Sequence, residues 1–466
     1  MQPIPTVDCE ALCSCNRVKW PMDVPARMTH LKSLLSFMNE KEYKIIHAMA
    51  DDLGRPKHEI VMSEISCVKY EIRDLLKRLK SWTKPLKIPK SHQFRRDKCR
   101  TEFQPLGTVL IIGSWNFPFQ SIMIPLAGAI AAGNCVIIKP NELSVETRKL
   151  FAEQIPKYLD RSICQVLSCT LDEIKDFLYS NKMDFIFFSG VSSDGAFVMS
   201  EAGRTITPVC LDLSGKCPAY IDDSADVELA AKRIMWGKIY NCGQSSLAPD
   251  YALCHLDVQP HFIKACKDVL VSFYNDLPNI DTEDYGRIVS QEHAQRLKEL
   301  MLETQGNCAF GGFTSVSHRF IQPTVITDVT ESDVLMQHEI YGPILPVISV
   351  KSSDDALEYV NNLPKPQAVY IFAKEKVIFE FWKKNTLSGG IILNDVVMLK
   401  GPNGMNFGGV DSSGMGRYRG RASIELFSHQ RGVIERSTKE KLDKIIRYPP
   451  YYENKTTALR KIFKDG

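Results

Sequence analysis

TVLIIGSWNFP, residues 108–118, is the stretch that decides the fold. Its first five residues form a continuous apolar run, which is typical of a strand buried on both faces of a parallel sheet. Residues 118–132 follow with a helix-like pattern, and 136–138 return to a short apolar strand before KPNE at 139–142. The stretch therefore predicts a strand, a crossover helix and a parallel strand, with polar loops at one edge of the sheet.

The same alternation continues on the C-terminal side of this unit. Residues 165–167 and 185–188 are candidate strands, and 172–179 and the segment from Ser193 onward are candidate helices. Alternating elements of this kind predict an α/β fold with a mostly parallel, doubly wound sheet. Such a sheet binds ligands at the carboxyl ends of its strands.

A second α/β unit begins after Ser214. It opens with a strand near Ala219, a helix over about 226–240 and a strand at 251–255, and the alternation runs on to Asn394. Outside the two units, residues 84–100 are rich in proline and basic side chains, which predicts an extended connector or an edge hairpin. We predict a first domain from 1–83 and 101–208, a second from 209–400, and an arm from 84–100 with the C-terminal segment 401–466.

The bulk composition narrows the class of protein. The chain has 466 residues and a formal net charge of only +3, so nucleic acid is not an expected partner. Its 14 cysteines are irregularly spaced and the N-terminus does not look like a signal peptide, so we expect reduced thiols in the cytoplasm. Cys9, Cys13 and Cys15 have no fourth ligand nearby, so no metal is expected. Prolines and glycines interrupt the uncharged stretch 103–138, so we expect no integral membrane segment.

Short motifs along the chain resemble those of the aldehyde dehydrogenases. They are WNFP at 115–118, KPNE at 139–142, FSG at 188–190, LDLSGK at 211–216, NCGQ at 241–244, EIYGP at 339–343 and NFGG at 406–409. APDY at 248–251 and RYPP at 447–450 resemble the class 3 branch in particular. The resemblance covers nearly the whole chain. It implies the aldehyde dehydrogenase fold: a Rossmann-like NAD(P)-binding domain, an α/β catalytic domain and an arm that bridges two subunits of a homodimer.

The resemblance also implies a reaction, the NAD(P)-dependent oxidation of a small aldehyde to a carboxylic acid. Asn116 matches the amide that holds the oxyanion of the tetrahedral adduct, a donor worth about 3 to 4 kcal/mol in a dry site. A helix cap near Pro118 is the alternative role for this asparagine. Lys139 and Glu142 match the pair that binds the adenosine ribose, with a surface ion pair as the alternative. Because a carboxylate there repels a 2′-phosphate, NAD is the expected cofactor, although class 3 members accept NADP as well.

Five further residues complete the cofactor site that the resemblance implies. Glu339 matches the glutamate that holds the nicotinamide ribose and assists deprotonation of water, with a helix-end carboxylate as the alternative. Phe407 matches the aromatic residue beside the nicotinamide, and an ordinary core phenylalanine is the alternative. Trp115, Gly190 and Gly195 lie within the cofactor motifs.

The nucleophile position departs from the family pattern, because Ser246 stands where the catalytic cysteine is expected. A cysteine thiol is a few per cent ionised at neutral pH, whereas a serine hydroxyl needs a dedicated general base. No Ser-His-Asp arrangement is visible in the sequence. Cys242 lies four residues earlier, and we expect it to be a structural thiol, since a shift of about 1 Å can already cost a hundredfold in rate.

Three more departures lie near the expected site. Asp212 replaces the general-base glutamate and reaches one methylene less far. Ser193 and Ser214 replace glycines, and Asp194 brings a carboxylate to a helix start, where it repels a pyrophosphate if it points inward.

These features leave three functional hypotheses open. The first is an NAD(P)-dependent aldehyde dehydrogenase whose activity is in doubt. The second is a catalytically inactive paralogue that acts by binding or dimerisation. The third and weakest is an esterase that uses Ser246.

Overall fold

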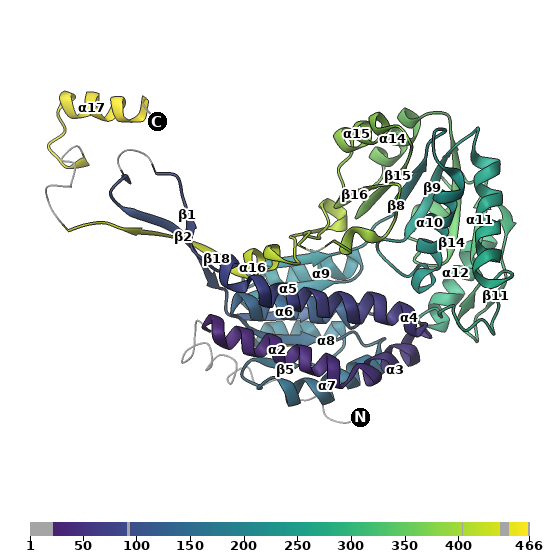
Figure 1. Ribbon diagram of the computed structural model, residues 1–466, viewed down its shortest axis with the longest axis horizontal. Helices are drawn as coiled ribbons and strands as arrows, with labels where there is room; N and C mark the ends of the chain where they lie inside the picture. Colours follow the sequence, from purple (N-terminus) through teal and green to yellow (C-terminus); the bar gives the residue numbers. More distant parts are fainter. Residues whose placement is uncertain (1–21, 91–93, 403, 439–446, 465–466) are drawn as a thin grey trace.

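The computed structural model describes residues 22–90, 94–402, 404–438 and 447–464, and the cysteines at positions 9, 13 and 15 lie outside them. Two α/β bodies lie side by side, and a thin arm extends away from the first (Figure 1). None of the described helices combines the length and the apolar character needed to cross a bilayer.

A six-stranded sheet, in the order β17-β7-β6-β3-β4-β5, forms the core of the first body. Its strands are β3 (Thr108–Ile112), β4 (Cys135–Lys139), β5 (Cys164–Val166), β6 (Phe185–Ser189), β7 (Val209–Asp212) and β17 (Gly414–Met415). All neighbours are parallel except β17 and β7. The chain leaves β3 toward β4 on one side and later returns to β6 on the other. This order confirms the doubly wound sheet, and it favours a ligand site at the carboxyl ends of β3 and β6.

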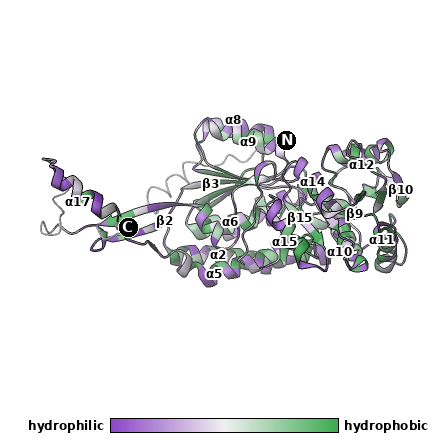
Figure 2. Ribbon diagram, turned by 90° about the horizontal axis from the view of Figure 1, so that it is seen from above, coloured by the Kyte–Doolittle hydropathy of each residue, from purple (hydrophilic) through white to green (hydrophobic). Residues whose placement is uncertain are grey.

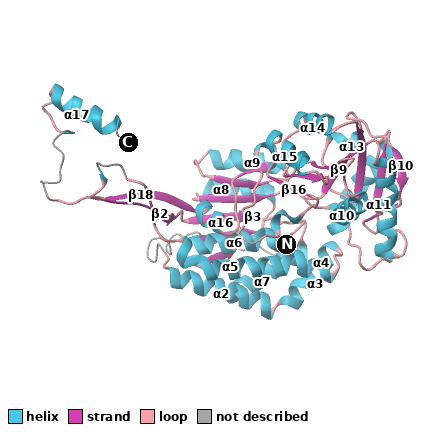
Figure 3. Cartoon of the chain, turned by 45° about the horizontal axis from the view of Figure 1, so that its top comes forward, coloured by secondary structure: helices cyan, strands magenta, loops and turns pink. Residues whose placement is uncertain are grey.

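Helices cover both faces of this sheet (Figure 3). On one face lie α2 (Val24–Glu40), α3 (Glu42–Leu53), α5 (Cys67–Trp82), α6 (Gln120–Ala132), α7 (Val145–Tyr158) and α16 (Arg421–Leu426). On the other lie α8 (Leu171–Ser180) and α9 (Ser192–Gly203). The short helix α4 (Lys57–Ile60) and the π-helical turn η1 (Val61–Ser66) join α3 to α5. Successive residues of β3 point to opposite faces: Val109 and Ile111 join one apolar cluster, and Leu110 and Ile112 join the other.

A seven-stranded sheet, in the order β10-β13-β14-β9-β8-β15-β16, forms the core of the second body. Its strands are β8 (Cys217–Ile221), β9 (Pro249–His255), β10 (Asn307–Phe310), β13 (Thr324–Thr327), β14 (Ile344–Val350), β15 (Ala368–Phe372) and β16 (Gly390–Leu393). Its helices are α10 (Val227–Ile239), α11 (Gln259–Tyr274), α12 (Gln291–Glu303), α13 (Val334–Gln337), α14 (Ser353–Asn362) and α15 (Lys376–Asn385). Smaller elements are η3 (Tyr240–Gly243), β11 (Thr314–Ser315), β12 (Phe320–Ile321), η4 (Met398–Lys400) and η5 (Asp411–Ser413).

The arm is a separate three-stranded antiparallel sheet in the order β1-β2-β18. It consists of β1 (Leu86–Lys87), β2 (Lys98–Pro105) and β18 (Ser428–Glu435), and α17 (Glu453–Lys464) follows beyond it. Figure 2 shows from above how the arm extends away from the two bodies. The predicted connector or hairpin at 84–100 thus contributes to a sheet that the C-terminal segment completes.

The first sheet extends beyond the predicted domain boundary at residue 208. β7 pairs with β6, and β17 pairs with β7 from within the C-terminal segment. The helix α16 of the same segment packs on α6. The sheet boundary therefore falls after Asp212, and part of 401–466 belongs to the first body because its backbone completes that sheet.

Candidate active site

The two bodies meet at a cavity of about 410 Å³. Asp212 and Gly190 come from the carboxyl ends of strands in the first sheet, whereas Ser214, Ser246 and Tyr341 come from loops that precede strands of the second. The carboxyl edge of one sheet thus faces the amino edge of the other. The full lining is Ser114, Asn116, Phe117, Gln120, Ser121, Ser189, Gly190, Asp212, Leu213, Ser214, Ser246, Tyr341, Lys400 and Tyr418.

A tight turn places Ser246 at the cavity wall. Asn241 and Cys242 have positive φ angles of 49° and 53°. Gly243 follows with φ of 70°, and a Cβ atom there would lie 2.3 Å from the carbonyl oxygen of Gly342, so only glycine fits. The Gln244 side chain then fixes the turn: its amide donates to the carbonyl of Asn241 at 3.0 Å, and its oxygen accepts from a backbone N–H at 2.9 Å.

The Ser246 hydroxyl makes no hydrogen bond to any group in the described part of the chain, and no described histidine lines the cavity. Its backbone carbonyl accepts from the thiol of Cys217 at 3.1 Å. A serine hydroxyl is not ionised near neutral pH unless a general base assists it. No described histidine in the cavity is placed to act as that base for Ser246.

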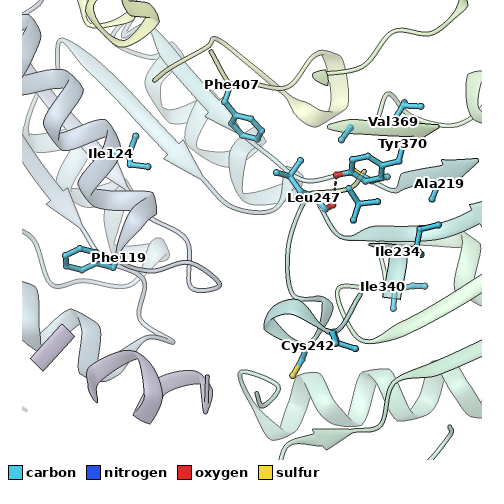
Figure 4. Packing of buried hydrophobic residues seen from close by; sticks show 14 of the residues in the cluster. Phe119, Ile124, Ala219, Ile234, Cys242, Leu247, Ile340, Val369, Tyr370 and Phe407 are labelled. Atoms are coloured by element: carbon cyan, nitrogen blue, oxygen red, sulfur yellow. Dashed lines mark hydrogen bonds between the residues drawn. The ribbon is translucent and has the colours of Figure 1, made fainter. Parts of the chain in front are cut away.

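Cys242 points away from this cavity. Its side chain is 1% exposed and packs within the core of the second body, near Gly286. Figure 4 shows its sulfur directed away from Leu247, the neighbour of Ser246. Burial raises the pKa of the Cys242 thiol far above its usual value, so the thiolate is not populated. This placement fits a structural thiol.

Asn116 and Tyr341 form a pair of donors on the cavity wall. The Asn116 amide donates to the carbonyl of Gln244 at 3.2 Å and to the Tyr341 hydroxyl at 2.6 Å, and it does not cap α6. Burial raises the pKa of Tyr341 well above its usual range, so its hydroxyl keeps its proton. The tyrosine hydroxyl can therefore donate to an oxygen in the cavity while it accepts from the amide.

Asp212 is buried and held on both oxygens. Gln367 donates to Oδ1 at 2.7 Å, and Tyr418 donates to Oδ2 at 2.9 Å. The ammonium of Lys400 lies 4.0 Å from Oδ2. Each of these contacts holds the carboxylate in place and opposes its use as a mobile general base.

Glu339 is held differently, at the amino edge of the second sheet. Its carboxylate accepts a hydrogen bond from the hydroxyl of Ser214 and another, at 3.3 Å, from the backbone N–H of Gly215. Burial raises the pKa of Glu339 to about 7, and the nearby charge of Asp250 acts in the same direction. A carboxyl group with a pKa near neutrality is suited to exchange protons at neutral pH. The two hydrogen bonds hold this side chain between the loops that precede β8 and β14.

The expected cofactor residues line the carboxyl edge of the first sheet. Lys139 ends β4, is 1% exposed and forms an ion pair with Glu142. Burial alone would raise the pKa of Glu142. The hydrogen bond and positive charge of Lys139 outweigh burial and hold that pKa below its usual value. The lysine is thus fully buried, unlike a surface ion pair.

Asp194 adds a carboxylate close to this pair. It lies in the first turn of α9 and is partly buried. Burial raises the pKa of Asp194, the charge of Glu142 raises it further, and Lys139 opposes both. The charge of Asp194 therefore acts close to the Lys139–Glu142 pair.

The remaining predicted residues are packed around the same edge. Trp115 contacts Tyr341, with their ring centroids 5.4 Å apart. Gly190 and Gly195 allow close packing, since a Cβ on either would lie 2.6 Å from a neighbouring side chain. Phe407 is 4% exposed and belongs to the main apolar cluster, although its ring also contacts the ammonium of Lys400 at 4.2 Å. Among the described residues, no group of His, Cys, Asp and Glu is arranged to hold a metal ion.

Comparison with known proteins agrees with this geometry. The model of the aldehyde dehydrogenase family matches residues 17–433. The chain belongs to the aldehyde dehydrogenase family.

Two kinds of relatives place this aldehyde dehydrogenase more closely. Mouse aldehyde dehydrogenase family 3 member B1 is 39% identical over 425 residues, which cover 91% of this chain and 90% of the relative. Family 3 member A2 of Pongo abelii is 41% identical over 430 residues, covering 92% and 88%. A solved structure of Staphylococcus aureus AldH in a substrate-bound state is 34% identical, covers 98% of each chain and has a TM-score of 0.94. These relatives confirm the resemblance to the class 3 branch and the predicted fold.

An apolar channel of about 620 Å³ adjoins this cavity. The two share Phe117, Gln120 and Lys400. The rest of the channel lining is mainly apolar: Met62, Ser63, Cys67, Trp236, Tyr240, Ser245, Leu247, Val397, Met398 and Gly401. Its walls suit an aliphatic or aromatic chain, with the polar end of the ligand in the catalytic cavity.

Four residues of the site were missed by the sequence analysis: Tyr341, Gln367, Lys400 and Tyr418. Tyr341 lies inside a quoted motif, and Gln367 directly precedes β15, so their positions before strands of the second sheet were an available signal. Lys400 and Tyr418 lie in the irregular segment around the glycine-rich run, where no periodic pattern indicates which side chains point inward.

Proposed function

We propose that this chain is an oxidoreductase of the aldehyde dehydrogenase family that binds NAD(P) and a small aldehyde with an apolar chain, and that turns the aldehyde over slowly. One observation carries the proposal. Ser246 lies in the cavity without a histidine partner, while the donors and the channel around it are intact. Binding needs the donors and the channel, whereas rapid capture of the carbonyl carbon needs a thiolate.

The described residues fit a bound dinucleotide at the carboxyl edge of the first sheet. Lys139 and Glu142 are the residues that would hold the adenosine ribose, and Glu339 would hold the nicotinamide ribose. When bound, NAD(P) supplies the acceptor for a hydride. Because Glu142 and Asp194 both place negative charge near the ribose site, we expect NAD to bind more tightly than NADP.

In this proposal the side chains of the chain orient and polarise the aldehyde. Tyr341, held in place by the Asn116 amide, directs its hydroxyl toward the carbonyl oxygen, and the apolar channel excludes water around the chain of the substrate. Glu339, with its pKa near 7, can exchange protons next to the cavity, where it accepts a hydrogen bond from the lining residue Ser214. The homodimer, the individual site roles and the cytoplasmic location expected from the sequence stay predictions.

A second candidate function is a catalytically inactive paralogue that acts by binding or dimerisation. Asp212 favours it, because Gln367 and Tyr418 hold both of its oxygens and leave it little freedom to act as a general base. In this alternative the cofactor and the aldehyde bind as they do in the first. The two candidates differ only in whether any NADH forms.

Binding of NAD⁺ by the natural chain tests what both candidates share. We expect Glu142→Ala to weaken NAD⁺ binding about tenfold, because a hydrogen bond to a charged group contributes roughly 1.5 kcal/mol. The control is Glu146→Ala, which removes an exposed carboxylate paired with Lys149 on α7. Isothermal titration calorimetry measures all three dissociation constants. Lack of NAD⁺ binding by the natural chain, or equal weakening by both substitutions, would contradict the proposal.

A further inference from the structure

Lys400 is a charged side chain at the junction of the catalytic cavity and the apolar channel. It ends η4, in the segment that leads from the second sheet back to the first body. Its side chain lines both spaces, together with Phe117 and Gln120. An aldehyde whose chain fills the channel therefore has to pass this amine to reach Ser246.

The surroundings of the Lys400 ammonium are partly apolar. The side chain is 24% exposed, its Nζ lies 4.2 Å from the centre of the Phe407 ring, and Asp212 is its nearest carboxylate at 4.0 Å. Burial lowers the pKa of Lys400, and the charge of Asp212 opposes this shift only in part. A desolvated lysine of this kind has a larger fraction of neutral amine at neutral pH than an exposed one.

We propose that Lys400 captures the aldehyde carbonyl as a Schiff base, in the cavity where Ser246 replaces the expected thiol. The inference rests on the proposed function, because it requires an aldehyde to enter this channel. It gives the chain a covalent aldehyde-binding activity that does not depend on the serine.

The reaction balances with solvent water as the proton carrier, since the Lys400 side chain is 24% exposed. The Lys400 ammonium gives one proton to solvent, and the neutral Nζ forms a bond to the carbonyl carbon, which yields a carbinolamine after a proton moves from nitrogen to oxygen. A proton from solvent then adds to the carbinolamine hydroxyl, the C–O bond breaks, and water leaves. The product is a protonated imine, so the single positive charge beside Asp212 is the same before and after the reaction.

Two other lysines with little or no exposure, Lys216 and Lys238, differ from Lys400. Lys216 donates to Asp250 at 2.5 Å and to the carbonyls of Leu335 and His338 at 2.9 Å, so its ammonium is held by three acceptors. Lys238 makes no hydrogen bond within the described residues, and burial lowers its pKa to about 8, but it is 0% exposed and lines neither space. Lys238 therefore serves as an internal comparison. Its pKa is lowered, but it lines neither the cavity nor the channel in which an aldehyde would bind.

Reductive trapping on the full-length natural chain tests the proposal. The protein is incubated with limiting octanal and sodium cyanoborohydride, and the position of each N-octyl-lysine is found by peptide mass spectrometry. We expect labelling of Lys400 at least about tenfold above that of exposed Lys267 on α11, because the channel holds the aldehyde next to the amine. We also expect no label on Lys238. Lys400→Arg keeps the positive charge beside Asp212 but forms no Schiff base, and it serves as the assignment control.

A parallel calorimetric titration with octanamide, which cannot form an imine, reports entry into the channel alone. Octanamide binding together with preferential labelling of Lys400 supports the inference. Octanamide binding with Lys400 labelled no more than Lys267 overturns the Schiff base and leaves aldehyde binding in place. If octanamide does not bind and Lys400 is not enriched, both the inference and the aldehyde-binding part of the proposed function are wrong.

Discussion

At the scale of single residues, the site separates groups that position a ligand from groups that react with it. The Asn116 amide donates to the Gln244 carbonyl and to the Tyr341 hydroxyl, which holds that hydroxyl in place to donate to an oxygen atom in the cavity. By contrast, no described histidine is positioned to activate the Ser246 hydroxyl for attack on a carbonyl carbon. Burial raises the pKa of Glu339, which binds the cavity residue Ser214, to about 7, and its ionisation has a measurable consequence.

Glu339→Gln is expected to stabilise the protein more at about pH 8 than at about pH 5. The pKa of Glu339 in the folded chain is about 7, above its value of 4.5 when unfolded. The unfolded chain thus loses this proton at a lower pH than the folded chain, so the contribution of Glu339 to stability falls as the pH rises between the two values. Glutamine does not ionise, so the variant does not lose this part of its stability as the pH rises.

Urea unfolding at both pH values measures the difference in free energy of unfolding between the variant and the natural chain. Glu303→Gln, at the exposed end of α12, is the control and should show no such pH dependence. A difference for Glu339→Gln that stays constant between the two pH values would show that the carboxyl is not held with a raised pKa.

At the scale of elements, the strands could be predicted from sequence because each is a short apolar run. The predicted strands at 108–112 and 185–188 match β3 and β6 closely, since buried parallel strands leave a continuous apolar signal. β17 gave no such signal, because it is two residues long and joins the sheet through its backbone. The arm was predicted as an extended connector or edge hairpin at 84–100 together with the segment 401–466, but the pairing of β2 with β18 was not predicted, since these strands have no continuous apolar run.

The arm carries a prediction about assembly. β18 is an edge strand of a sheet outside the two bodies, and Ile434 on it is 60% exposed. We expect a homodimer of twice 52.7 kDa that buries this surface. Ile434→Lys should raise the dimer dissociation constant at least about tenfold, since burying an isoleucine side chain contributes roughly 1.5 to 3 kcal/mol.

Sedimentation equilibrium measures the mass of the natural chain and of two variants. Val377→Lys is the control, because Val377 is 65% exposed on α15, far from the arm. A natural chain that sediments as a monomer at micromolar concentration would refute the homodimer. An equal effect of both substitutions would place the interface elsewhere.

At the scale of the whole molecule, the active-site cavity exists only because two sheets meet edge to edge. Sequence motifs identified Asn116, Ser246 and Glu339, which lie in loops next to strands. They did not identify Gln367 or Tyr418, which reach Asp212 across 155 and 206 residues of chain. Such contacts depend on how the bodies pack, and a single sequence carries no periodic signal for them.

The chain has the fold of the aldehyde dehydrogenases, and we propose that the serine in place of a cysteine at position 246 limits its turnover. The fold, the channel and the donors are present in the natural chain. Replacing the side-chain oxygen of residue 246 with sulfur should therefore change the rate of NADH formation without changing the fold. The thiol of a cysteine at this position would be ionised to a few per cent or more at neutral pH.

The rate of NADH formation from NAD⁺ and octanal is the most direct test. The natural chain is compared with Ser246→Cys, with Ser246→Cys combined with Asp212→Glu, and with Ser246→Ala, which has no nucleophile at this position. We predict that Ser246→Cys is faster than the natural chain by about a hundredfold or more, and that the natural chain is no faster than Ser246→Ala. A natural chain that forms NADH as fast as Ser246→Cys would contradict the account.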